Sequence, residues 1–286
     1  MEKILITGGS GFIGSHLSEF LLGRNYKPII FDTKTIPSNG IECYIGDITK
    51  KDSLKEISEV DGIVHLCAIS RVKDAFDNPA HCMDINLMGT INILEFARTS
   101  KKNPWVLIGS TTEPPKNIYG VSKHLAELCA ETYSREYNLN ISALRFGTVY
   151  GSPRDNQDRL IPRWIENAKS GKEIIVDNPA RQFDFIYIDD VIEGIFRGIN
   201  YVSYGRPFEA IPICAGTPTN LGDLAKIIVE EAQSPSKIIS KDAHQEYFIQ
   251  PNPEKARNLL EFEAKTSMRE GIRRLLSVDL LNYVES

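Results

Sequence analysis

Two side chains that could move a proton together stand four residues apart, at the start of a stretch with helical patterning. Tyr119 and Lys123 would lie on one face of a helix, because residues four apart are neighbours on a helical surface. A tyrosine with its usual pKa of about 10 is a poor base at neutral pH, and a neighbouring ammonium group lowers that pKa by stabilising the phenolate. This spacing is common by chance. The catalytic interpretation is favoured by the preceding glycine loop and by the hydroxyl residues Ser110, Thr111 and Thr112.

A glycine-rich loop near the N-terminus has the pattern of a phosphate-binding turn. Gly8, Gly11 and Gly14 follow the apolar run Lys3–Thr7 and open the amphipathic stretch Phe12–Leu22. Glycine here allows a tight turn, close approach of the backbone to a pyrophosphate, and close packing of helix on strand. The pyrophosphate would then sit on free N–H groups at the helix N-terminus. A purely structural turn would use the same glycines, but the strand before and the helix after favour a dinucleotide site.

An aspartate at the end of the second strand-like run selects between two dinucleotides. Asp32 comes 18 residues after Gly14, close to the ~20 expected for a carboxylate that binds the ribose hydroxyls of adenosine. A carboxylate there repels the 2′-phosphate of NADP, and no arginine follows within reach. The sequence therefore predicts NAD, with a plain helix-capping aspartate as the alternative.

The elements that would carry these residues alternate between short apolar runs and amphipathic stretches. The apolar, largely β-branched runs predict strands buried on both faces: Lys3–Thr7, Pro28–Asp32, Ile41–Ile45, Gly62–Leu66, Trp105–Gly109 and Asn140–Arg145. The amphipathic stretches predict helices over Phe12–Leu22, Asp52–Ile57, Asp84–Arg98 and Val121–Tyr137. This alternation predicts an α/β fold with a Rossmann doubly wound parallel sheet, whose strand carboxyl ends share one ligand-binding edge.

The second half of the chain is punctuated by Pro and Gly and indicates a different architecture. Helices are predicted over Leu160–Ser170, Leu221–Ala232, Glu254–Leu260 and Met268–Leu281, with strand-like runs at Lys172–Val176 and Phe183–Ile188. We expect a smaller C-terminal α+β substrate lobe that caps the edge of the sheet. The expected division is an NAD-binding Rossmann domain over 1–152 plus about 182–200, and a substrate-binding lobe over 153–181 and 201–286.

Composition narrows the class of protein. The chain has 286 residues and a formal net charge of −5 with no long basic stripe, which argues against a nucleic-acid partner. No run approaches the roughly 18 apolar residues of a membrane span, and no secretion leader is recognisable, so we expect no membrane partner and a cytoplasmic location. The five cysteines and five histidines show no CxxC, HxxxH or HExxH spacing, so we expect reduced thiols and no metal site.

Taken in order, the motifs resemble those of the extended short-chain dehydrogenase/reductases, the NAD-dependent epimerase/dehydratase family that modifies nucleotide sugars. The resemblance runs over nearly the whole chain. After the glycine loop and Asp32, the matching segments are Gly46-Asp47-Ile48, His65-Leu66-Cys67-Ala68, Asn86-Leu87-Met88-Gly89-Thr90, Arg145–Gly151, Asp184–Val191 and Pro253–Arg257. Each segment is a modest signal, and their order makes the set specific.

The resemblance implies a role for each matching residue. Tyr119 would be the general acid/base, Lys123 would hold the nicotinamide ribose and tune Tyr119, and Thr111 or its neighbour Ser110 would bond the substrate oxygen. Thr148 and Arg181 would contact the substrate. The implied NAD contacts are Gly8, Gly11, Phe12, Ile13, Gly14, Asp32, Asp47, Ile48, Leu66, Ala68, Tyr119 and Lys123. A homodimer is implied as well, through the helices predicted over Asp84–Arg98 and Val121–Tyr137.

This chain departs from the family pattern around the substrate. Thr148 stands where an asparagine is usual, and Phe183 replaces an arginine, with Arg181 two residues upstream. A late arginine that grips the substrate diphosphate in relatives is missing from the stretch that holds Gln245, Glu246, Tyr247 and Gln250. Arg159, Arg163, Arg181 and Arg206 could substitute for it. Thr111 and Tyr119 are also only eight residues apart, so the substrate mouth is expected to be open or completed by a partner subunit.

Three reactions share this group of residues. An epimerase or a dehydratase would act through a transient 4-keto sugar, with NAD regenerated in each cycle. The run Ser110-Thr111-Thr112-Glu113 resembles that of the 4,6-dehydratases, in which a carboxylate at the position of Glu113 helps to remove water; a surface loop acid is the alternative reading. An ordinary NAD-dependent dehydrogenase/reductase on a sugar or another small alcohol or ketone is a third reaction. A non-catalytic dinucleotide-binding protein would usually have a broken Tyr–Lys pair, and here the pair is intact.

Overall fold

Seven parallel strands form the central sheet of the computed structural model, which describes residues 1–34, 40–241 and 248–278. The strand order is β11-β6-β5-β4-β1-β2-β3. Their bounds are β1 Lys3–Thr7, β2 Lys27–Asp32, β3 Glu42–Ile45, β4 Gly62–His65, β5 Trp105–Thr111, β6 Ile141–Phe146 and β11 Ala210–Ile213. The order reverses beside β1, as in a doubly wound sheet, and the Rossmann fold expected from the alternation is confirmed.

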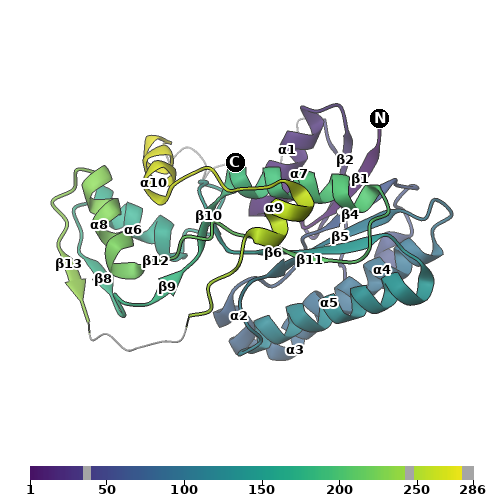
Figure 1. The fold of residues 1–286 in the computed structure, drawn as a ribbon, viewed down its shortest axis with the longest axis horizontal. Coiled ribbons are helices and arrows are strands. Elements are labelled where there is room, and N and C mark those ends of the chain that lie inside the picture. The colour runs from purple at the N-terminus through teal and green to yellow at the C-terminus, as the bar shows by residue number, and fades with distance from the viewer. Residues whose placement is uncertain (35–39, 242–247, 279–286) are drawn as a thin grey trace.

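Two helical layers bury the two faces of this sheet. Figure 1 shows α1 (Phe12–Leu22) and α7 (Ile188–Ser203) on one side, and α4 (Gly89–Thr99) and α5 (Ile118–Tyr137) on the other. Successive strand residues point to opposite layers. Ile4 and Ile6 therefore belong to one hydrophobic core and Leu5 to the other, and each is 0% exposed. Burial on both sides explains why these strands read as unbroken apolar runs.

A second group of elements lies beyond the carboxyl ends of the strands. It contains α6 (Leu160–Lys169), α8 (Leu221–Glu231), α10 (Met268–Ser277) and two small paired sheets, β8 (Ile174–Val176) with β13 (Ile238–Ser240) and β9 (Gln182–Phe183) with β12 (Thr219–Asn220). Figure 1 shows this group at the left of the sheet. Strands β7 (Thr148–Tyr150) and β10 (Phe185–Tyr187) pair in parallel. In the chain, β7 follows β6, and β10 directly precedes α7.

Two elements of the central layer differ from the sequence-based expectation. The run around 183–188 is split into β9 and β10, and α7 begins directly afterwards at Ile188, a helix that the sequence analysis did not predict. Strand β11 also went unpredicted, although it pairs in parallel with β6. It contains Pro212 at the edge of the sheet, where the missing N–H costs no ladder bond. Strand β11 lies inside the range 201–286, so part of the range expected for the substrate lobe joins the sheet.

Other predicted helices are shorter or interrupted. The stretch 52–57 holds only the single turn η1 (Lys51–Leu54), and 84–98 is divided into the π-helical turn η2 (Asp84–Met88) and α4. Two further short helices, α2 (Val72–Asp77) and α3 (Pro79–Met83), precede η2, and α9 (Glu254–Leu260) agrees with its predicted bounds. The end of the predicted helix 268–281 lies outside the described residues. Within those residues, no helix is long and apolar enough to cross a membrane.

Candidate active site

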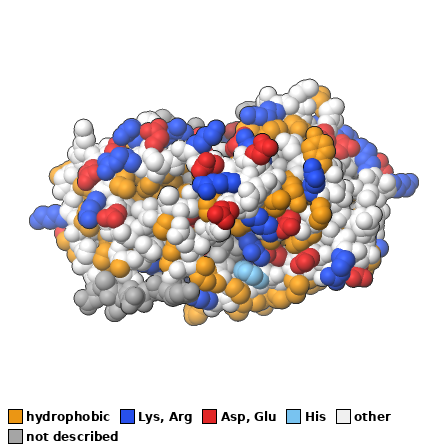
Figure 2. Space-filling model, viewed as in Figure 1, with side chains coloured by type: hydrophobic (Ala, Val, Ile, Leu, Met, Phe, Trp, Pro, Cys, Tyr) orange, Lys and Arg blue, Asp and Glu red, His pale blue; other side chains and the backbone are white. Residues whose placement is uncertain are grey.

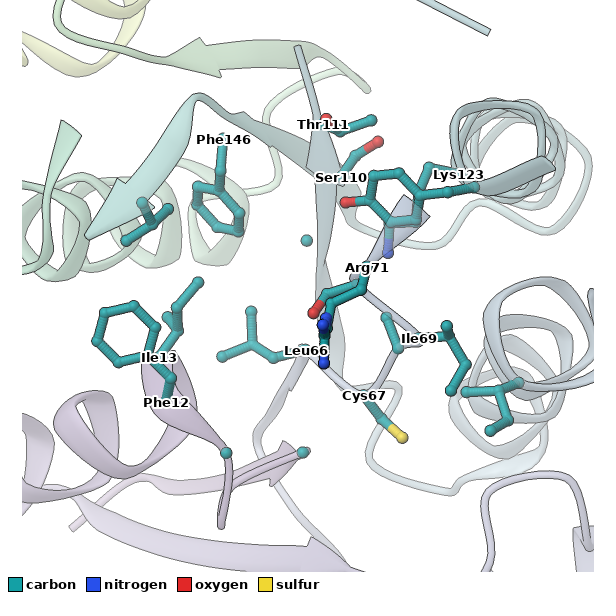
Figure 3. Close-up of a pocket in the computed structure, with 18 of the residues that line it drawn as sticks. Phe12, Ile13, Leu66, Cys67, Ile69, Arg71, Ser110, Thr111, Lys123 and Phe146 are labelled. Carbon is teal, nitrogen blue, oxygen red and sulfur yellow. The ribbon is translucent and has the colours of Figure 1, made fainter. Parts of the chain in front are cut away.

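The carboxyl ends of the central strands open into one cavity of about 690 Å³. The lining includes nearly all residues that the sequence analysis singled out: Gly8, Gly11, Phe12, Ile13, Gly14, Asp32, Asp47, Ile48, Leu66, Ala68, Ser110, Thr111, Glu113, Tyr119, Lys123 and Thr148. Figure 3 shows Phe12 and Ile13 on one side of the cavity, with Ser110, Thr111 and Lys123 on the other. Arg181 is the exception among the predicted site residues, since it lines a neighbouring cavity.

The glycine loop has the geometry that close contact with a phosphate requires. Gly8 has a φ of +71°, and a Cβ atom at this position would lie 2.7 Å from the backbone nitrogen of Cys67. Gly11 donates its N–H to the Gly8 carbonyl at 3.0 Å and is the N-cap of α1. Because Gly11 carries no side chain, it leaves the first N–H groups of α1 to be satisfied by a ligand. The loop therefore fits a dinucleotide pyrophosphate.

Two carboxylates beyond the glycine loop are held in fixed positions. Asp32, at the end of β2, accepts hydrogen bonds from the N–H of Ser10 at 3.1 Å and the N–H of Thr33 at 2.7 Å. Asp47 accepts from the N–H and the hydroxyl of Thr49, and these bonds lower the pKa of its carboxyl. The Asp32 carboxylate lies beside the phosphate loop, where it fits ribose hydroxyls and would repel an added phosphate.

Tyr119 and Lys123 lie in the first turns of α5, as their spacing predicts. The helix is capped by Asn117, whose side chain accepts the N–H of Gly120 at 2.8 Å. The Lys123 side chain is buried, and this burial lowers its pKa to about 8. Burial also raises the pKa of Tyr119 to about 12, with the negative charge of Glu113 as the second cause. The expected lowering of the Tyr119 pKa by Lys123 is therefore wrong for this structure, because desolvation of the phenolate dominates.

The two hydroxyl residues at the end of β5 have different partners. Thr111 is hydrogen-bonded to the side chain of Tyr119 and accepts the N–H of Glu113 at 3.1 Å. Ser110 instead donates its hydroxyl to the buried carboxylate of Glu127. Figure 3 shows both residues beside Lys123 at the wall of the cavity. The geometry favours Thr111 as the hydroxyl that shares a substrate oxygen with Tyr119, an alternative that the sequence left open.

A second cavity of about 370 Å³ adjoins the first, and the two share Thr112, Glu113 and Thr148 in their walls. The second cavity is also lined by Arg181 and Phe183, and the Arg181 guanidinium lies 4.9 Å from the centre of the Phe183 ring. Burial raises the pKa of the Glu113 carboxyl, which the positive charge of Arg181 partly offsets. Glu113 thus stands where the two cavities meet, close enough to Tyr119 to influence its titration.

Among the cationic residues of the first cavity that sequence reasoning missed is Arg71. Arg71 follows β4, lines the cavity and lies 3.8 Å from a carboxylate oxygen of Asp158. Arg159, considered only as a substitute for a diphosphate arginine, also lines the cavity and donates to the hydroxyl of Ser70 at 3.1 Å. Both residues lie in irregular segments, where no periodicity shows which side chains turn inward. Gln245, Glu246 and Tyr247, which occupy the stretch where relatives carry a late arginine, lie outside the described residues.

A doubly wound sheet that aligns a glycine loop suited to phosphate, a carboxylate suited to ribose hydroxyls and a Thr–Tyr–Lys group along one edge is typical of dinucleotide-dependent enzymes acting on hydroxyl or carbonyl groups. Residues 4–214 match the NAD dependent epimerase/dehydratase family. The chain belongs to this family, as its motifs indicated, and it is an NAD-dependent enzyme of the epimerase/dehydratase type.

Individual relatives point in the same direction. A Methanocaldococcus jannaschii protein, provisionally named a UDP-glucose 4-epimerase, is 31% identical over 96% of this chain and 97% of its own length. The UDP-glucuronate 4-epimerase of Thermodesulfobacterium geofontis is 28% identical, with 97% of this chain and 96% of that protein covered. The solved UDP-glucose 4-epimerase of Thermotoga maritima, in complex with UDP-glucose, shares the fold with a TM-score of 0.84 at 23% identity, covering 96% of this chain and 97% of that one.

Proposed function

We propose that this chain is an NAD-dependent UDP-sugar 4-epimerase that works through a transient 4-keto sugar. The observation that carries the proposal is the placement of Thr111, Tyr119 and Lys123 on the wall of the dinucleotide-shaped cavity, beside the opening into the second cavity. A sugar at that opening would meet the hydroxyl groups of Tyr119 and Thr111 on one side and the cofactor on the other. UDP is the nucleotide named for two relatives that are similar over nearly the whole chain.

The residues of the first cavity fit NAD. The α1 N-terminus and the glycine loop would hold the pyrophosphate, Asp32 the adenosine ribose, and Asp47 with Ile48 the side of the adenine. When bound, NAD would supply reversible hydride transfer at C4 of the sugar. Lys123 would bond the second ribose from its buried position on α5.

The chain's own residues would move one proton at the sugar O4. The phenolate oxygen of Tyr119 would take this proton as C4 is oxidised, becoming the neutral phenol, and would give it back when C4 is reduced on the opposite face. Thr111, already hydrogen-bonded to Tyr119, would orient O4 toward the phenol oxygen. The Lys123 ammonium would lower the cost of the phenolate, which is substantial because burial raises the pKa of Tyr119 to about 12.

The second cavity would hold the UDP part of the substrate. Arg181 is placed to pair with a phosphate, and Phe183 and Phe248 offer apolar faces to the base. With this assignment, Arg181 would bind the substrate although it lies two residues upstream of the usual arginine position in the family. Thr148, shared by both cavities, would lie beside the sugar.

Glu113 favours dehydration as a second candidate function. Its carboxyl stands between the two cavities, and burial raises its pKa. In a 4-keto sugar the proton at C5 is acidic, and a carboxylate at Glu113 could take it and pass it to the departing C6 hydroxyl, which leaves as water. A 4-epimerase needs no such group and leaves the C5–H bond intact.

Isotope labelling separates the two reactions. UDP-glucose and UDP-glucuronate are each incubated with the enzyme and NAD in heavy water, and the products are examined by NMR. An inverted C4 without deuterium at C5 is expected for the epimerase. Deuterium at C5 together with loss of water from UDP-glucose would show that the enzyme is a dehydratase and not an epimerase. Both effects should then be abolished in Glu113→Gln. Release of one NADH per sugar would indicate an ordinary dehydrogenase, and turnover that survives Tyr119→Phe would remove Tyr119 from the mechanism.

We also propose that the chain forms a homodimer through α4 and α5. Leu125 and Leu128 on α5 are 38% and 59% exposed, and Met88, just before α4, is 45% exposed. Figure 2 shows hydrophobic side chains along the lower edge of the molecule, where Figure 1 places α3 and α5. Helix α5 also carries Tyr119 and Lys123 on its inner face, so the dimer interface would support the element that holds the catalytic pair.

A further inference from the structure

An ion pair with a buried carboxylate lies directly behind the proposed catalytic residues. The Glu127 side chain on α5 is only 6% exposed, and Arg145 on β6 donates to both of its carboxylate oxygens, with Nη2 at 2.6 Å from Oε2 and Nε at 3.1 Å from Oε1. The Ser110 hydroxyl donates to Oε1 as well. The Arg145 side chain is 36% exposed, so the desolvation cost falls mainly on the Glu127 carboxylate, and stability alone is a weak reason to bury that charge.

The three residues join the three elements that build the proposed catalytic site. Glu127 lies one helical turn after Lys123 and two turns after Tyr119 on α5, and its side chain faces the sheet as theirs do. Ser110 is the neighbour of Thr111 on β5, and Arg145 lies opposite Ser110 in the register of β5 and β6. One carboxylate thereby links the helix that carries Tyr119 and Lys123 to the strand that carries Thr111.

We propose that Glu127 is a positioning residue, which together with Ser110 and Arg145 holds Tyr119 and Lys123 on α5 at a fixed distance and angle from Thr111 on β5. The inference rests on the catalytic roles of those three residues in the proposed function. It assigns to Ser110 the role of an anchor for α5, which is distinct from contact with the substrate. A displacement of about 1 Å at a reacting group can lower the rate about a hundredfold. Fixing the position of α5 relative to β5 would therefore explain the presence of a buried carboxylate at Glu127.

Glu127 also acts on Lys123 through its charge. The titratable groups that act on Lys123 are Glu127 on α5, His65 at the end of β4, Cys67 just after that strand, and Cys82 on α3. Burial keeps His65 uncharged and raises the pKa of the Cys67 thiol to about 12. Of these groups, Glu127 supplies the carboxylate charge that supports the Lys123 ammonium against desolvation.

The test compares Glu127→Gln with Glu131→Gln, an exposed position one turn further along the same helix. With UDP-sugar and NAD, Glu127→Gln should lower kcat by about a hundredfold, while KM and the NAD dissociation constant change by less than threefold. The alkaline limb of the pH profile of kcat, which reports loss of the Lys123 proton, should move to lower pH in Glu127→Gln. The reason is that the variant lacks the Glu127 carboxylate charge that stabilises the Lys123 ammonium. Glu131→Gln should match the parent enzyme in all four measurements.

A second variant keeps the inference falsifiable if Glu127→Gln does not fold. Ser110→Ala retains the ion pair and Thr111 but cuts the link to β5, so kcat should fall at least tenfold with NAD binding unchanged. The positioning role is refuted if Ser110→Ala and every folded Glu127 variant have the same kcat and the same pH profile of kcat as the parent enzyme. Retained turnover in Thr111→Val and Tyr119→Phe would instead refute the proposed function, which keeps the two failures distinguishable.

Discussion

At the scale of single residues, we propose that Asp32 decides which dinucleotide the cavity accepts. Its carboxylate is fixed by the N–H groups of Ser10 and Thr33 and cannot turn away from the ribose without losing these bonds. A 2′-phosphate would bring like charge against it. We expect NAD to bind at least tenfold more tightly than NADP, a difference of about 1.4 kcal/mol, and Asp32→Ala to lose most of this preference. Calorimetric titration with both dinucleotides measures it, and equal affinities for the parent protein would contradict the assignment.

Most residues singled out for the first cavity could be predicted from sequence because they belong to short local patterns. Gly8, Gly11 and Gly14 are defined by spacing alone, and Tyr119 with Lys123 by one helical turn. Glu127 had no such signal, because its partners Ser110 and Arg145 are 17 and 18 positions away. The pKa of Tyr119 was mispredicted for a related reason, since spacing reports the neighbour but not the depth of burial.

At the scale of elements, helix α1 must approach β1 closely for its N-terminus to reach a phosphate. A Cβ atom on Gly14 would collide with the Gly8 carbonyl oxygen and lie 2.7 Å from the Gly9 Cα, so Gly14→Ala must displace the helix or the loop. We expect it to weaken NAD binding by at least tenfold and to lower the melting temperature.

The other end of the same helix provides the matched control for Gly14→Ala. A Cβ atom on Gly23 would approach its neighbours no closer than 3.6 Å, and Gly23 has an ordinary φ of −64°. Gly23→Ala should therefore leave NAD binding unchanged and maintain or slightly raise the melting temperature. Equal effects of the two substitutions on NAD binding would show that the close contact at Gly14 does not shape the site.

Elements were predictable from sequence where their hydrophobic period was clear and their ends were marked. Strands β1 to β6 and helix α1 satisfy both conditions. Helix α7 did not, because its buried start at Ile188 continues the apolar run of β10 and hides the change of period. Strand β11 is four residues long and contains a proline, so local preference argued against it, and pairing with β6 stabilises it instead.

At the scale of the whole molecule, the exposed apolar face of α5 predicts self-association. Leu128→Glu would place a charge on a position that is 59% exposed in the single chain and buried in the proposed dimer. We expect the substitution to convert a dimer to a monomer in light scattering coupled to size exclusion. The matched control is Ile175→Glu, because Ile175 on β8 is 47% exposed and lies outside α4 and α5. This substitution should leave the dimer intact. A parent protein that elutes as a monomer at micromolar concentration would contradict the proposal.

The stability of the whole fold should fall in mild acid because one histidine is held uncharged at its centre. His65 is 1% exposed and joins β1 and α4 through Thr7 at 2.6 Å and Thr90 at 3.1 Å. Burial lowers its pKa to about 3, with Lys123 adding a repulsive positive charge. The unfolded chain binds a proton below its ordinary pKa of about 6.5, whereas the folded chain does not, so stability decreases as pH falls from 6.5 toward 3.

This loss can be isolated by substitution, since acidic groups with raised pKa values such as Asp155 change stability in the opposite direction. Both parent and His65→Asn contain those groups, so the difference between them reports His65 alone. Between pH 7 and pH 5 the parent should lose about 2 kcal/mol more unfolding free energy than His65→Asn, which follows from the shift in proton binding. Urea unfolding at the two pH values measures this difference, with His81→Asn on the exposed side of α3 as control. Parallel pH dependences for parent and His65→Asn would show that His65 does not carry the acid sensitivity of the fold.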